Sequence, residues 1–334
     1  LGLMGIIVPK EYGGMGGDYK MYIKAVEELS KVCATTGVIL SAHTSLCIAP
    51  IMEYGNEEQK KKYLPKLASG EWLGAFGLTE PNAGTDANNQ TTTAVKEGDH
   101  WVLNGSKIFI TNAGPANVYF VIAVTGRNPK GVECAAFIVE KGFPGFSVGK
   151  KELKMGIRGS STCELIFENC IVPEANLVGK IGEGVKMALK TLDGGRVGIS
   201  AQALGIAEGA LEATVAYVKE RKQFNKPISA FQNTQFCLAD LYTKINAASL
   251  LVERATEAKQ NKSPMLGMYA AQAKLFAAET AMEVTTKCVQ LHGGYGYTRE
   301  YPVERMMRDA KITEIYEGTS EVQRMVISGA LLKK

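Results

Sequence analysis

One carboxylate stands out among the residues that could do chemistry. Glu317 lies in residues 315–321, which read Ile-Tyr-Glu-Gly-Thr-Ser-Glu. A carboxylate with little hydration holds its proton more tightly, and this brings a weak base toward the strength that carbon acids require near neutral pH. The glycine that follows lets the backbone approach a ligand closely. The pattern therefore indicates a candidate general base, although a Tyr-Glu-Gly turn is more often purely structural.

Signals for a metal or for a phosphate-binding loop are weak. No strict Gly-x-Gly-x-x-Gly occurs, so a Rossmann-type dinucleotide site is not indicated. The three histidines include no His-x₃-His pair, and the seven cysteines include no Cys-x-x-Cys pair. An odd number of scattered cysteines is typical of reduced thiols in a cytosol-like compartment. We expect no metal site and no disulfide framework.

The periodicity of apolar residues divides the chain into three parts. Residues 1–70 carry helical spacing, with Ser69-Gly70 as a stop signal. Residues 71–182 alternate β-rich runs, at 118–124, 135–139 and 165–172, with turns, and Asn104-Gly105 between apolar runs predicts a hairpin. These features predict an N-terminal helical domain followed by a small antiparallel β domain.

Residues 183–334 return to a helical period. Apolar residues recur three and four apart in four long segments, which indicates an antiparallel helical bundle. The stripes are Leu204, Ala207, Leu211, Val215 and Val218; Leu238, Leu241, Ile245, Ala248 and Val252; Met268, Ala271, Leu275, Ala278 and Met282; and Val322, Val326 and Gly329. The predicted class is α+β, with strands confined to the middle of the chain.

Composition excludes several other classes of protein. Apolar residues make up 46% and charged residues 22%, which is typical of a globular chain with a substantial core. The net charge is only +4, and Lys60-Lys61-Lys62 follows two glutamates, so we expect a solvated helix face and no nucleic-acid site. No apolar stretch is expected to reach the roughly 18 residues of a membrane span. Because the chain opens at Leu1 without a methionine, we expect it to be a fragment.

Three segments resemble one known family. Residues 77–86 read Gly-Leu-Thr-Glu-Pro-Asn-Ala-Gly-Thr-Asp, residues 290–297 read Gln-Leu-His-Gly-Gly-Tyr-Gly-Tyr, and residues 316–324 read Tyr-Glu-Gly-Thr-Ser-Glu-Val-Gln-Arg. They resemble both signatures and the catalytic loop of the acyl-CoA dehydrogenases, collinearly over essentially the whole chain. Residues 154–162 and the Asp-Gly-Gly-Arg run at 193–196 look closest to the short-chain (butyryl-CoA) branch. Asn89 departs from the family, which usually has a small residue there.

The resemblance implies the family's three-part fold, with a C-terminal four-helix bundle, and FAD as cofactor. In the family, the flavin ring lies between the β domain and the bundle, and a neighbouring subunit holds part of the ADP half. Positions that match flavin contacts are Phe76, Leu78, Thr79, Gly84, Thr85, Phe109, Ile110, Thr111, Thr319 and Glu321. Positions that match contacts to the ADP half are Arg221, Phe224, Gln232, Gln290, Leu291, His292, Gly293 and Gly294. Read without the resemblance, residues 109–111 form an ordinary half-buried strand and Arg221 is a helix C-terminal arginine.

Substrate contacts follow from the same resemblance. The matching positions are Thr85, Asp193, Arg196, Tyr316 and Gly318. Isovaleryl and long-chain relatives carry their catalytic glutamate where this chain has Gly195. The glycine therefore leaves Glu317 as the only candidate base.

The implied reaction is α,β-dehydrogenation of a short-chain acyl-CoA, of the butyryl-CoA to crotonyl-CoA type. Glu317 removes the α-proton, and the β-hydrogen leaves as hydride to the flavin. The backbone amide of Glu317 and a flavin ribityl hydroxyl stabilise the enolate oxygen, in the manner of an oxyanion hole. The electrons then pass to electron-transferring flavoprotein.

The resemblance also implies a homotetramer built as a dimer of dimers, because the ADP site needs two chains. We expect Arg221 and Gln290 not to reach one FAD within a subunit. The location is cytoplasmic for a bacterial protein and the mitochondrial matrix for a eukaryotic one. The alternatives are another chain length or a branched acyl group, an oxidase, or a catalytically silent flavoprotein subunit. A glutaryl-CoA specificity is disfavoured because the matching stretch, residues 32–51, contains no arginine or lysine.

Overall fold

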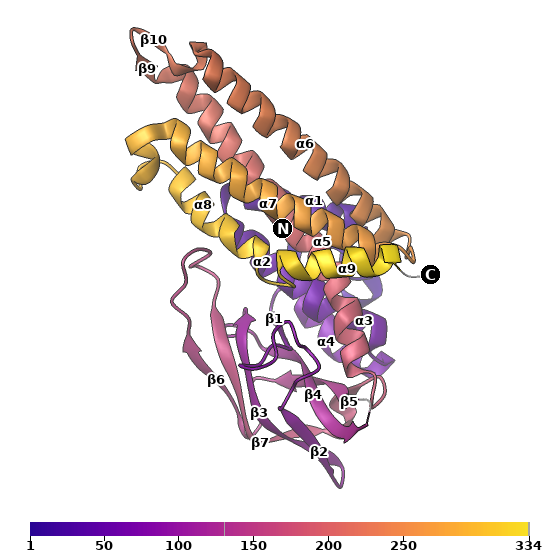
Figure 1. Cartoon of the computed structure of the whole chain (residues 1–334). Helices are drawn as coiled ribbons and strands as arrows, with labels where there is room; N and C mark the ends of the chain where they lie inside the picture. The colour runs from indigo at the N-terminus through magenta and orange to yellow at the C-terminus, as the bar shows by residue number, and fades with distance from the viewer. Residues whose placement is uncertain (130, 333–334) are drawn as a thin grey trace. The chain divides into compact units, whose positions relative to one another are not determined.

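The computed structural model describes residues 1–129 and 131–332, which belong to two compact units (Figure 1). The first unit consists of Leu1–Asp18, Ile39–Leu153 and Ser160–Gly195. The second consists of Tyr19–Val38, Lys154–Gly159 and the chain from Arg196 onward. Along the sequence, helices are followed by strands and then by helices again, which confirms the predicted α+β class.

The first unit is built on a sheet that has eight strands within the described residues. The strands are β1 (Gly74–Gly77), β2 (Thr93–Glu97), β3 (His100–Thr111), β4 (Val118–Asn128), β5 (Gly131–Glu140), β6 (Phe146–Lys151), β7 (Thr162–Pro173) and β8 (Leu177–Val178). Their order is β6-β7-β3-β2-β4-β5-β8, with β1 beside β4. Neighbours run antiparallel, as predicted, except that β1 and β2 pair with β4 in parallel.

The Asn104-Gly105 dipeptide does not form the predicted hairpin, because β3 runs straight through it with a shift in register against β7. Gly105 has a φ of +137°, and a Cβ there would lie 2.7 Å from the Cα of Thr92. The side-chain oxygen of Asn104 accepts the backbone N–H of Asn169 at 2.8 Å. The dipeptide therefore forms a β-bulge in which the glycine permits close packing. The hairpin turn lies earlier, at Gly98, between β2 and β3.

Strand β4 shows where the core of this unit lies, because both of its faces are buried. Val118, Phe120 and Ile122 pack in one cluster with residues of the helical segment 42–68. Their neighbours in sequence, such as Tyr119 and Val121, pack in a second cluster with residues of β3, β5 and β7. This alternation follows from the two-residue period of a strand. The sheet is thus held from both sides.

The remaining elements of the first unit are mostly helical. They are η1 (Leu3–Gly5), η2 (Lys10–Tyr12), η3 (Ala42–Ile48), α3 (Ala49–Tyr54), α4 (Glu57–Ser69), η4 (Glu174–Asn176) and the start of α5 (Gly184–Glu220). Helix α4 begins at a capping box formed by Asn56 and Gln59. It ends at Gly70, which has a φ of 78° and confirms the predicted stop.

The second unit is helical. Its elements are α1 (Tyr19–Val32), the rest of α5, β9 (Lys222–Gln223), β10 (Lys226–Pro227), η5 (Ile228–Ala230), α6 (Gln232–Gln260), α7 (Leu266–His292), η6 (Gly293–Tyr297), α8 (Val303–Lys311), η7 (Ile312–Glu314) and α9 (Ser320–Leu332). Helices α6 and α7 lie side by side, and α7 also packs against α8 and α9 (Figure 1). The predicted stripe residues Leu241, Ile245, Ala248 and Val252 are buried, as a core-facing helix requires.

One helical stretch corrects an expectation about membrane spans. Residues 34–54, from α2 (Ala34–Ser41) to α3, form 21 helical residues with a mean hydropathy of 1.4, enough by length and composition to cross a membrane. In its most apolar window, 72% of the residues are buried. Burial of this kind is typical of the core helix of a globular protein.

Candidate active site

Glu317 lies in a tight turn between η7 and α9, within the second unit. Its backbone φ is 54°, and that of the next residue, Gly318, is 94°. A left-handed conformation is uncommon for glutamate and is concentrated at functional sites. A Cβ on Gly318 would lie 2.7 Å from the side-chain nitrogen of Gln323, so a larger residue there would displace the amide that holds the turn. The sequence signal of an unusual Glu-Gly pair therefore corresponds to unusual backbone geometry.

Three side chains hold the two carbonyl groups of this turn. The amide of Gln323, on α9, donates to the Glu317 carbonyl at 3.3 Å and to the Gly318 carbonyl at 2.8 Å. The ammonium of Lys274, on α7, donates to the Gly318 carbonyl at 2.8 Å. Nε of Arg196, on α5, donates to the Glu317 carbonyl at 3.5 Å. Because the donors come from three different helices, the turn is fixed by the bundle as a whole.

Unlike the backbone carbonyl of Glu317, its carboxyl group has an oxygen that accepts no hydrogen bond in the described chain. Its Oε2 atom is buried and has no hydrogen-bond partner among residues 1–129 and 131–332. Burial raises the pKa of this carboxyl to about 7, while the positive charges of Lys274 and Arg196 oppose the rise. A carboxyl with this pKa is substantially ionised at neutral pH yet still binds a proton readily. These are the properties of a general base.

Lys274 was not among the residues that the sequence pattern singled out. Its side chain is fully buried, and burial lowers the pKa of its ammonium to about 8, opposed chiefly by the Glu317 carboxylate. The signal was present in the sequence, because position 274 follows Ala271 by three and precedes Ala278 by four. A lysine on the apolar stripe of a helix indicates a buried charge with a function.

Tyr316 is fixed through a neighbouring glutamine. Its hydroxyl hydrogen-bonds the side-chain oxygen of Gln202, whose own amide donates to the Ala34 carbonyl at 2.9 Å. Burial, with the charge of Glu317 as a second cause, raises the pKa of the Tyr316 hydroxyl. The tyrosine next to the candidate base is therefore neutral and already bonded within the unit. Gln202 is a second residue that the sequence pattern did not identify.

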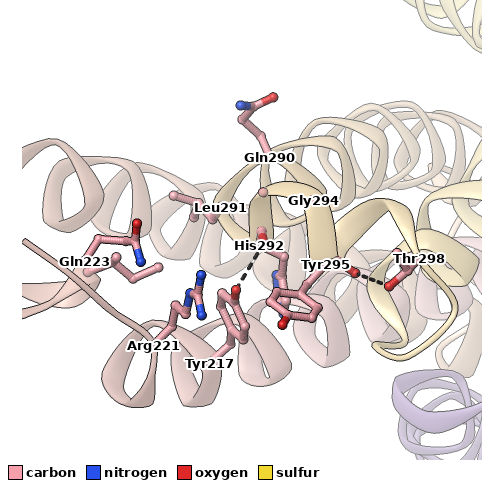
Figure 2. A pocket seen from close by; sticks show the side chains of 11 residues that line it. Tyr217, Arg221, Gln223, Gln290, Leu291, His292, Gly294, Tyr295 and Thr298 are labelled. Carbon is pink, nitrogen blue, oxygen red and sulfur yellow. Dashed lines mark hydrogen bonds between the residues drawn. The ribbon is translucent and has the colours of Figure 1, made fainter.

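A cavity of about 500 Å³ lies elsewhere in the second unit (Figure 2). It is lined by Tyr217, Arg221, Gln223, Ile228, Gln290, Leu291, His292, Gly293, Gly294, Tyr295 and Thr298. Arg221 and Gln290, which we expected to be unable to serve one ligand within a subunit, thus line the same cavity. That expectation is wrong because the end of α5 and the end of α7 meet there.

The groups around this cavity suit an anionic and partly aromatic ligand. The ring of Tyr217 stacks on that of His292 with 4.2 Å between centroids, and its hydroxyl donates to the His292 carbonyl at 3.2 Å (Figure 2). Nε2 of His292 is buried without a partner in the described chain, and burial lowers the pKa of this imidazole. The guanidinium of Arg221 lies over the Tyr295 ring, 5.4 Å from its centroid. An exposed guanidinium beside neutral rings is apt for a phosphate group.

The remaining predicted ADP contacts lie outside this lining. Phe224, with a φ of 51°, is 88% exposed and packs edge-on against Phe231. Gln232 is exposed at the first turn of α6. Neither lines the cavity that Arg221 shares with Gln290.

In the first unit, the structure brings two of the predicted flavin segments together. The backbone N–H of Ile108 donates to the Thr79 carbonyl at 2.8 Å, so the segment after β1 lies against the end of β3. Phe109 has a φ of 57° and is 61% exposed, which is unusual for a phenylalanine on a strand. Thr79 and Thr111 are half-buried, and the loop residues Gly84 and Thr85 are exposed. The end of β3 and the segment after β1 therefore present an aromatic ring and hydroxyl groups.

Other residues predicted for this segment face the core. Phe76 stacks on Phe120 with 6.2 Å between ring centroids, and Leu78 belongs to the same cluster. Ile110 packs in the second cluster of the unit. Their side chains are buried, so any contact that they make with a ligand would come mainly from the backbone.

A buried ion pair, which the sequence pattern did not identify, fixes the same segment. Nζ of Lys107, on β3, donates to Oε1 of Glu80 at 2.6 Å, to Gln90 at 2.8 Å and to the Leu78 carbonyl at 3.2 Å. The other carboxylate oxygen of Glu80 accepts the backbone N–H of Thr91 at 2.6 Å. The neighbouring ammonium holds the pKa of Glu80 at about 2 in spite of burial, and burial lowers that of Lys107 to about 8.

Three family models match the chain in order. They are "Acyl-CoA dehydrogenase, N-terminal domain" over residues 1–71, "Acyl-CoA dehydrogenase, middle domain" over 75–170 and "Acyl-CoA dehydrogenase, C-terminal domain" over 182–332. The chain belongs to the acyl-CoA dehydrogenase family. It is therefore an oxidoreductase, as the sequence predicted.

The acyl-CoA dehydrogenase is similar to short-chain members. It is 62% identical to "Acyl-CoA dehydrogenase, short-chain specific" of Clostridium acetobutylicum, over 99% of this chain and 87% of that protein. The solved structure of butyryl-CoA dehydrogenase from Megasphaera elsdenii matches with a TM-score of 0.97 and 54% identity, over 99% of this chain and 88% of the other.

A second solved structure also has a TM-score of 0.97, with 58% identity, over 100% of this chain and 87% of the other. It is described as "Electron transferring flavoprotein of Acidaminococcus fermentans: Towards a mechanism of flavin-based electron bifurcation".

The last predicted residues of the dehydrogenase are spread over several elements. Asp193 and Arg196 lie on α5, on either side of the boundary between the two units. The Thr319 hydroxyl accepts the backbone N–H of Val322 at 3.4 Å and so begins α9, while Glu321 is exposed. No cluster of three or more metal-ligating side chains occurs in the part of the chain that the structure describes.

Proposed function

We propose that this acyl-CoA dehydrogenase catalyses the FAD-dependent α,β-dehydrogenation of a short-chain acyl-CoA, with Glu317 as the base. The observation that carries the proposal is the Glu317 carboxyl, buried and unpartnered at Oε2, with its pKa raised to about 7. A carboxylate already bonded to a cation would be a poor acceptor for a carbon-bound proton. Glu317 is therefore ready to accept the α-proton of a thioester on its carboxylate oxygen.

The backbone of the same turn would support the enolate. Removal of the α-proton leaves negative charge on the thioester oxygen, and a positioned N–H donor stabilises such charge. The backbone N–H of Glu317 makes no backbone hydrogen bond within residues 1–129 and 131–332. Because Lys274, Gln323 and Arg196 hold the adjoining carbonyls, this N–H is kept in one orientation. One residue would thus supply both the proton acceptor and a donor to the oxyanion.

FAD, when bound, supplies the two-electron acceptor that takes the β-hydrogen as hydride. The cavity around Arg221 and residues 290–294 fits the phosphates and the adenine end, because it combines a guanidinium, stacked aromatic rings and the orphaned Nε2 of His292. Phe109, Thr79 and Thr111 offer the aromatic and hydroxyl groups that suit a flavin. Thr319 and Glu321 complete the proposed cofactor set, with Phe76, Leu78, Gly84, Thr85, Ile110, Phe224 and Gln232.

The proposed substrate is butyryl-CoA or a close neighbour. This rests on the similarity to short-chain relatives and on the Asp-Gly-Gly-Arg run at 193–196, with Thr85, Asp193, Arg196, Tyr316 and Gly318 as substrate contacts. A series of saturated acyl-CoA esters tests this assignment through the rate of anaerobic flavin bleaching. Faster reduction by palmitoyl-CoA than by butyryl-CoA would contradict it.

For the electron acceptor we propose electron-transferring flavoprotein, and for the assembly a homotetramer built as a dimer of dimers. The description of one similar structure supports the first proposal. The second rests on the family resemblance alone, because Arg221 and Gln290 already line one cavity within a chain. The location would be the cytoplasm in a bacterium or the mitochondrial matrix in a eukaryote. Sedimentation of the flavin-loaded protein tests the assembly, and a fully flavinated monomer at micromolar concentration would contradict it.

Glu317→Gln tests the central assignment. The substitution keeps the shape of the side chain but removes the proton acceptor, so we expect anaerobic flavin reduction by butyryl-CoA to fall by about 10²–10⁴-fold. Binding of FAD and of the acyl-CoA should persist, as measured by the flavin spectrum and by calorimetry. Glu253→Gln, which removes an exposed carboxylate from α6, is the control and should reduce at the rate of the unmodified protein. Near-normal reduction in Glu317→Gln would end the assignment.

A further inference from the structure

Lys274 places a buried positive charge next to the turn that carries Glu317, and burying a charge costs free energy. Its side chain is fully buried on α7, where alanines such as Ala270, Ala277 and Ala278 are its buried neighbours on the helix. A buried ammonium requires compensation by hydrogen bonds and nearby negative charge. The hydrogen bond that the structure gives it is to the Gly318 carbonyl, at 2.8 Å. An apolar side chain would fill this position without the free-energy cost of removing a charge from water. The presence of a lysine therefore indicates a role for its charge.

The charged groups near the turn come from several elements. Lys274 on α7 and Arg196 on α5 act on the Glu317 carboxyl and both lower its pKa. The Tyr19 hydroxyl on α1 and the Tyr316 hydroxyl within the turn also feel the Glu317 charge.

Seen from Lys274, the surrounding charges are mostly negative. They are Glu317, Glu314 on η7 and Glu321 on α9, while Arg196 adds a positive charge. Lys274 is thus a fully buried cation whose charge is stabilised mainly by Glu317.

We propose that Lys274 is a positioning residue for the base: its ammonium holds the Glu317–Gly318 turn through the Gly318 carbonyl and keeps a positive charge beside the Glu317 carboxylate. The inference rests on the proposed role of Glu317 and adds to it the residue that maintains its orientation and its ionisation. Lys274 does not contact the reacting atoms in this account. It acts through Glu317.

The positional part of the proposal follows from the backbone. The left-handed backbone of Glu317, with a φ of 54°, persists only when its surroundings determine it, whereas Gly318 adopts its positive φ at no steric cost. Gln323 also donates to the Gly318 carbonyl, but it belongs to α9, the helix that the turn itself begins. Lys274 provides the tie to α7, a helix that is remote in sequence. Without it, the turn would lose its hydrogen bond to α7, and the tie from outside α9 would be the longer bond from Arg196, at 3.5 Å.

The electrostatic part follows from the direction of the charges. Burial alone would make the Glu317 carboxyl hold its proton so tightly that little carboxylate is present at neutral pH. The Lys274 charge opposes burial and so increases the ionised fraction. Removing this charge should leave Glu317 protonated up to a higher pH, and the rate of proton abstraction should then be lost from the acidic side.

Three variants of Lys274 separate the two contributions. Lys274→Met removes the charge and the donor, Lys274→Gln removes the charge but keeps a donor, and Lys274→Arg keeps both. Lys287→Met is the matched control, because it removes an exposed lysine from the same helix. Each protein is compared as the FAD-loaded full chain, first in the pH profile of anaerobic flavin reduction by butyryl-CoA, then in amide hydrogen exchange of residues 312–323.

The proposal predicts distinct results for the two measurements. The acidic midpoint of the pH profile should rise by about one pH unit or more in Lys274→Met and Lys274→Gln, which is the size expected for a nearby opposite charge. It should not move in Lys274→Arg or Lys287→Met. Exchange at residues 312–323 should accelerate most in Lys274→Met. If Lys274→Met does not fold, Lys274→Gln carries the test of the charge.

Two outcomes would overturn the proposal. One is an unchanged acidic midpoint in both uncharged variants, and the other is exchange at residues 312–323 that equals that of Lys287→Met. Failure of the underlying function is separate, because it would appear as normal flavin reduction in Glu317→Gln. In that case the exchange measurement still decides whether Lys274 holds the turn.

Discussion

Among residues 1–129 and 131–332, two buried lysines lie near a buried carboxyl group, and they lead to opposite chemistry. In the first unit, Lys107 donates directly to Glu80 at 2.6 Å, and the pKa of that carboxyl falls to about 2. In the second unit, Lys274 donates to the Gly318 carbonyl, Oε2 of Glu317 is left without a partner in the described chain, and the pKa of that carboxyl rises to about 7. The lysines themselves are alike, because burial lowers the pKa of each to about 8.

The difference shows what separates a structural ion pair from a reactive site. Direct hydrogen bonds to the charged form of a carboxyl favour ionisation, whereas burial without such bonds disfavours it. Glu80 also accepts from the backbone N–H groups of Thr91 and Thr92, so its oxygens are occupied. For Glu317, the donors instead bind backbone carbonyls. The charge is supplied nearby, and the carboxylate oxygen stays free for a proton.

The largest effect that would sharpen this comparison is the loss of flavin reduction in Glu317→Gln, described above. Glu80→Gln should instead leave flavin reduction intact and reduce the stability of the protein. It leaves the proposed base intact but removes the partner of a buried ammonium, so we expect a loss of about 3–5 kcal/mol in the free energy of unfolding. Denaturant unfolding of the FAD-free and FAD-loaded protein measures this loss.

A double variant provides the control for Glu80→Gln. Glu80→Gln/Lys107→Met removes both charges, and the free energy of unfolding should recover most of the loss because no uncompensated charge remains. If Glu80→Gln alone unfolds with the stability of the unmodified protein, the buried pair does not fix this segment, and the contrast with Glu317 fails.

The smallest expected effect is on the stability of Glu317→Gln. The Glu317 carboxyl has a pKa of about 7 in the folded protein against an ordinary value of 4.5, so the folded state binds the proton more tightly than the unfolded state does. Stability therefore falls as the pH rises from about 4.5 to 7. Glu317→Gln removes this dependence and should be more stable than the unmodified protein above pH 7, by at most about 3 kcal/mol.

Thermal unfolding at several pH values checks this prediction. The gain in stability of Glu317→Gln should be absent near pH 4.5 and should grow with pH until about 7. A gain that does not depend on pH would mean that ionisation of Glu317 is not its cause.

The sequence predicted the fold largely from periodicity. The apolar stripes of α5, α6 and α7, the stop at Gly70 and the strands around residues 118–124, 135–139 and 165–172 all appear in the structure. The hairpin predicted at Asn104-Gly105 was wrong, because a dipeptide that favours a tight turn also suits a β-bulge. Only the packing of Thr92 against Gly105 decides between the two structures. Local sequence does not contain that contact.

The site was only partly predictable for a similar reason. Glu317 was identifiable from its flanking residues, and Arg221 and residues 290–294 were identifiable by resemblance. That they line one cavity within a chain was not, because this depends on where the ends of α5 and α7 meet. Lys107 and Lys274 were not predicted because hydrophobic periodicity depends on apolar residues and carries no information about the charges between them. A lysine within an apolar run is the signal that would have found both.

The most direct test of the account is a pH titration of the Glu317 carboxyl itself. Infrared difference spectra of the FAD-loaded, substrate-free protein, with the spectrum of Glu317→Gln subtracted, report the protonated form of this one group. We expect Glu317 to titrate near pH 7, while Glu80 stays ionised down to about pH 2 or until the protein unfolds. Titration of Glu317 near pH 4.5, together with the exposed carboxylates, would contradict the claim that burial without a partner makes it a base.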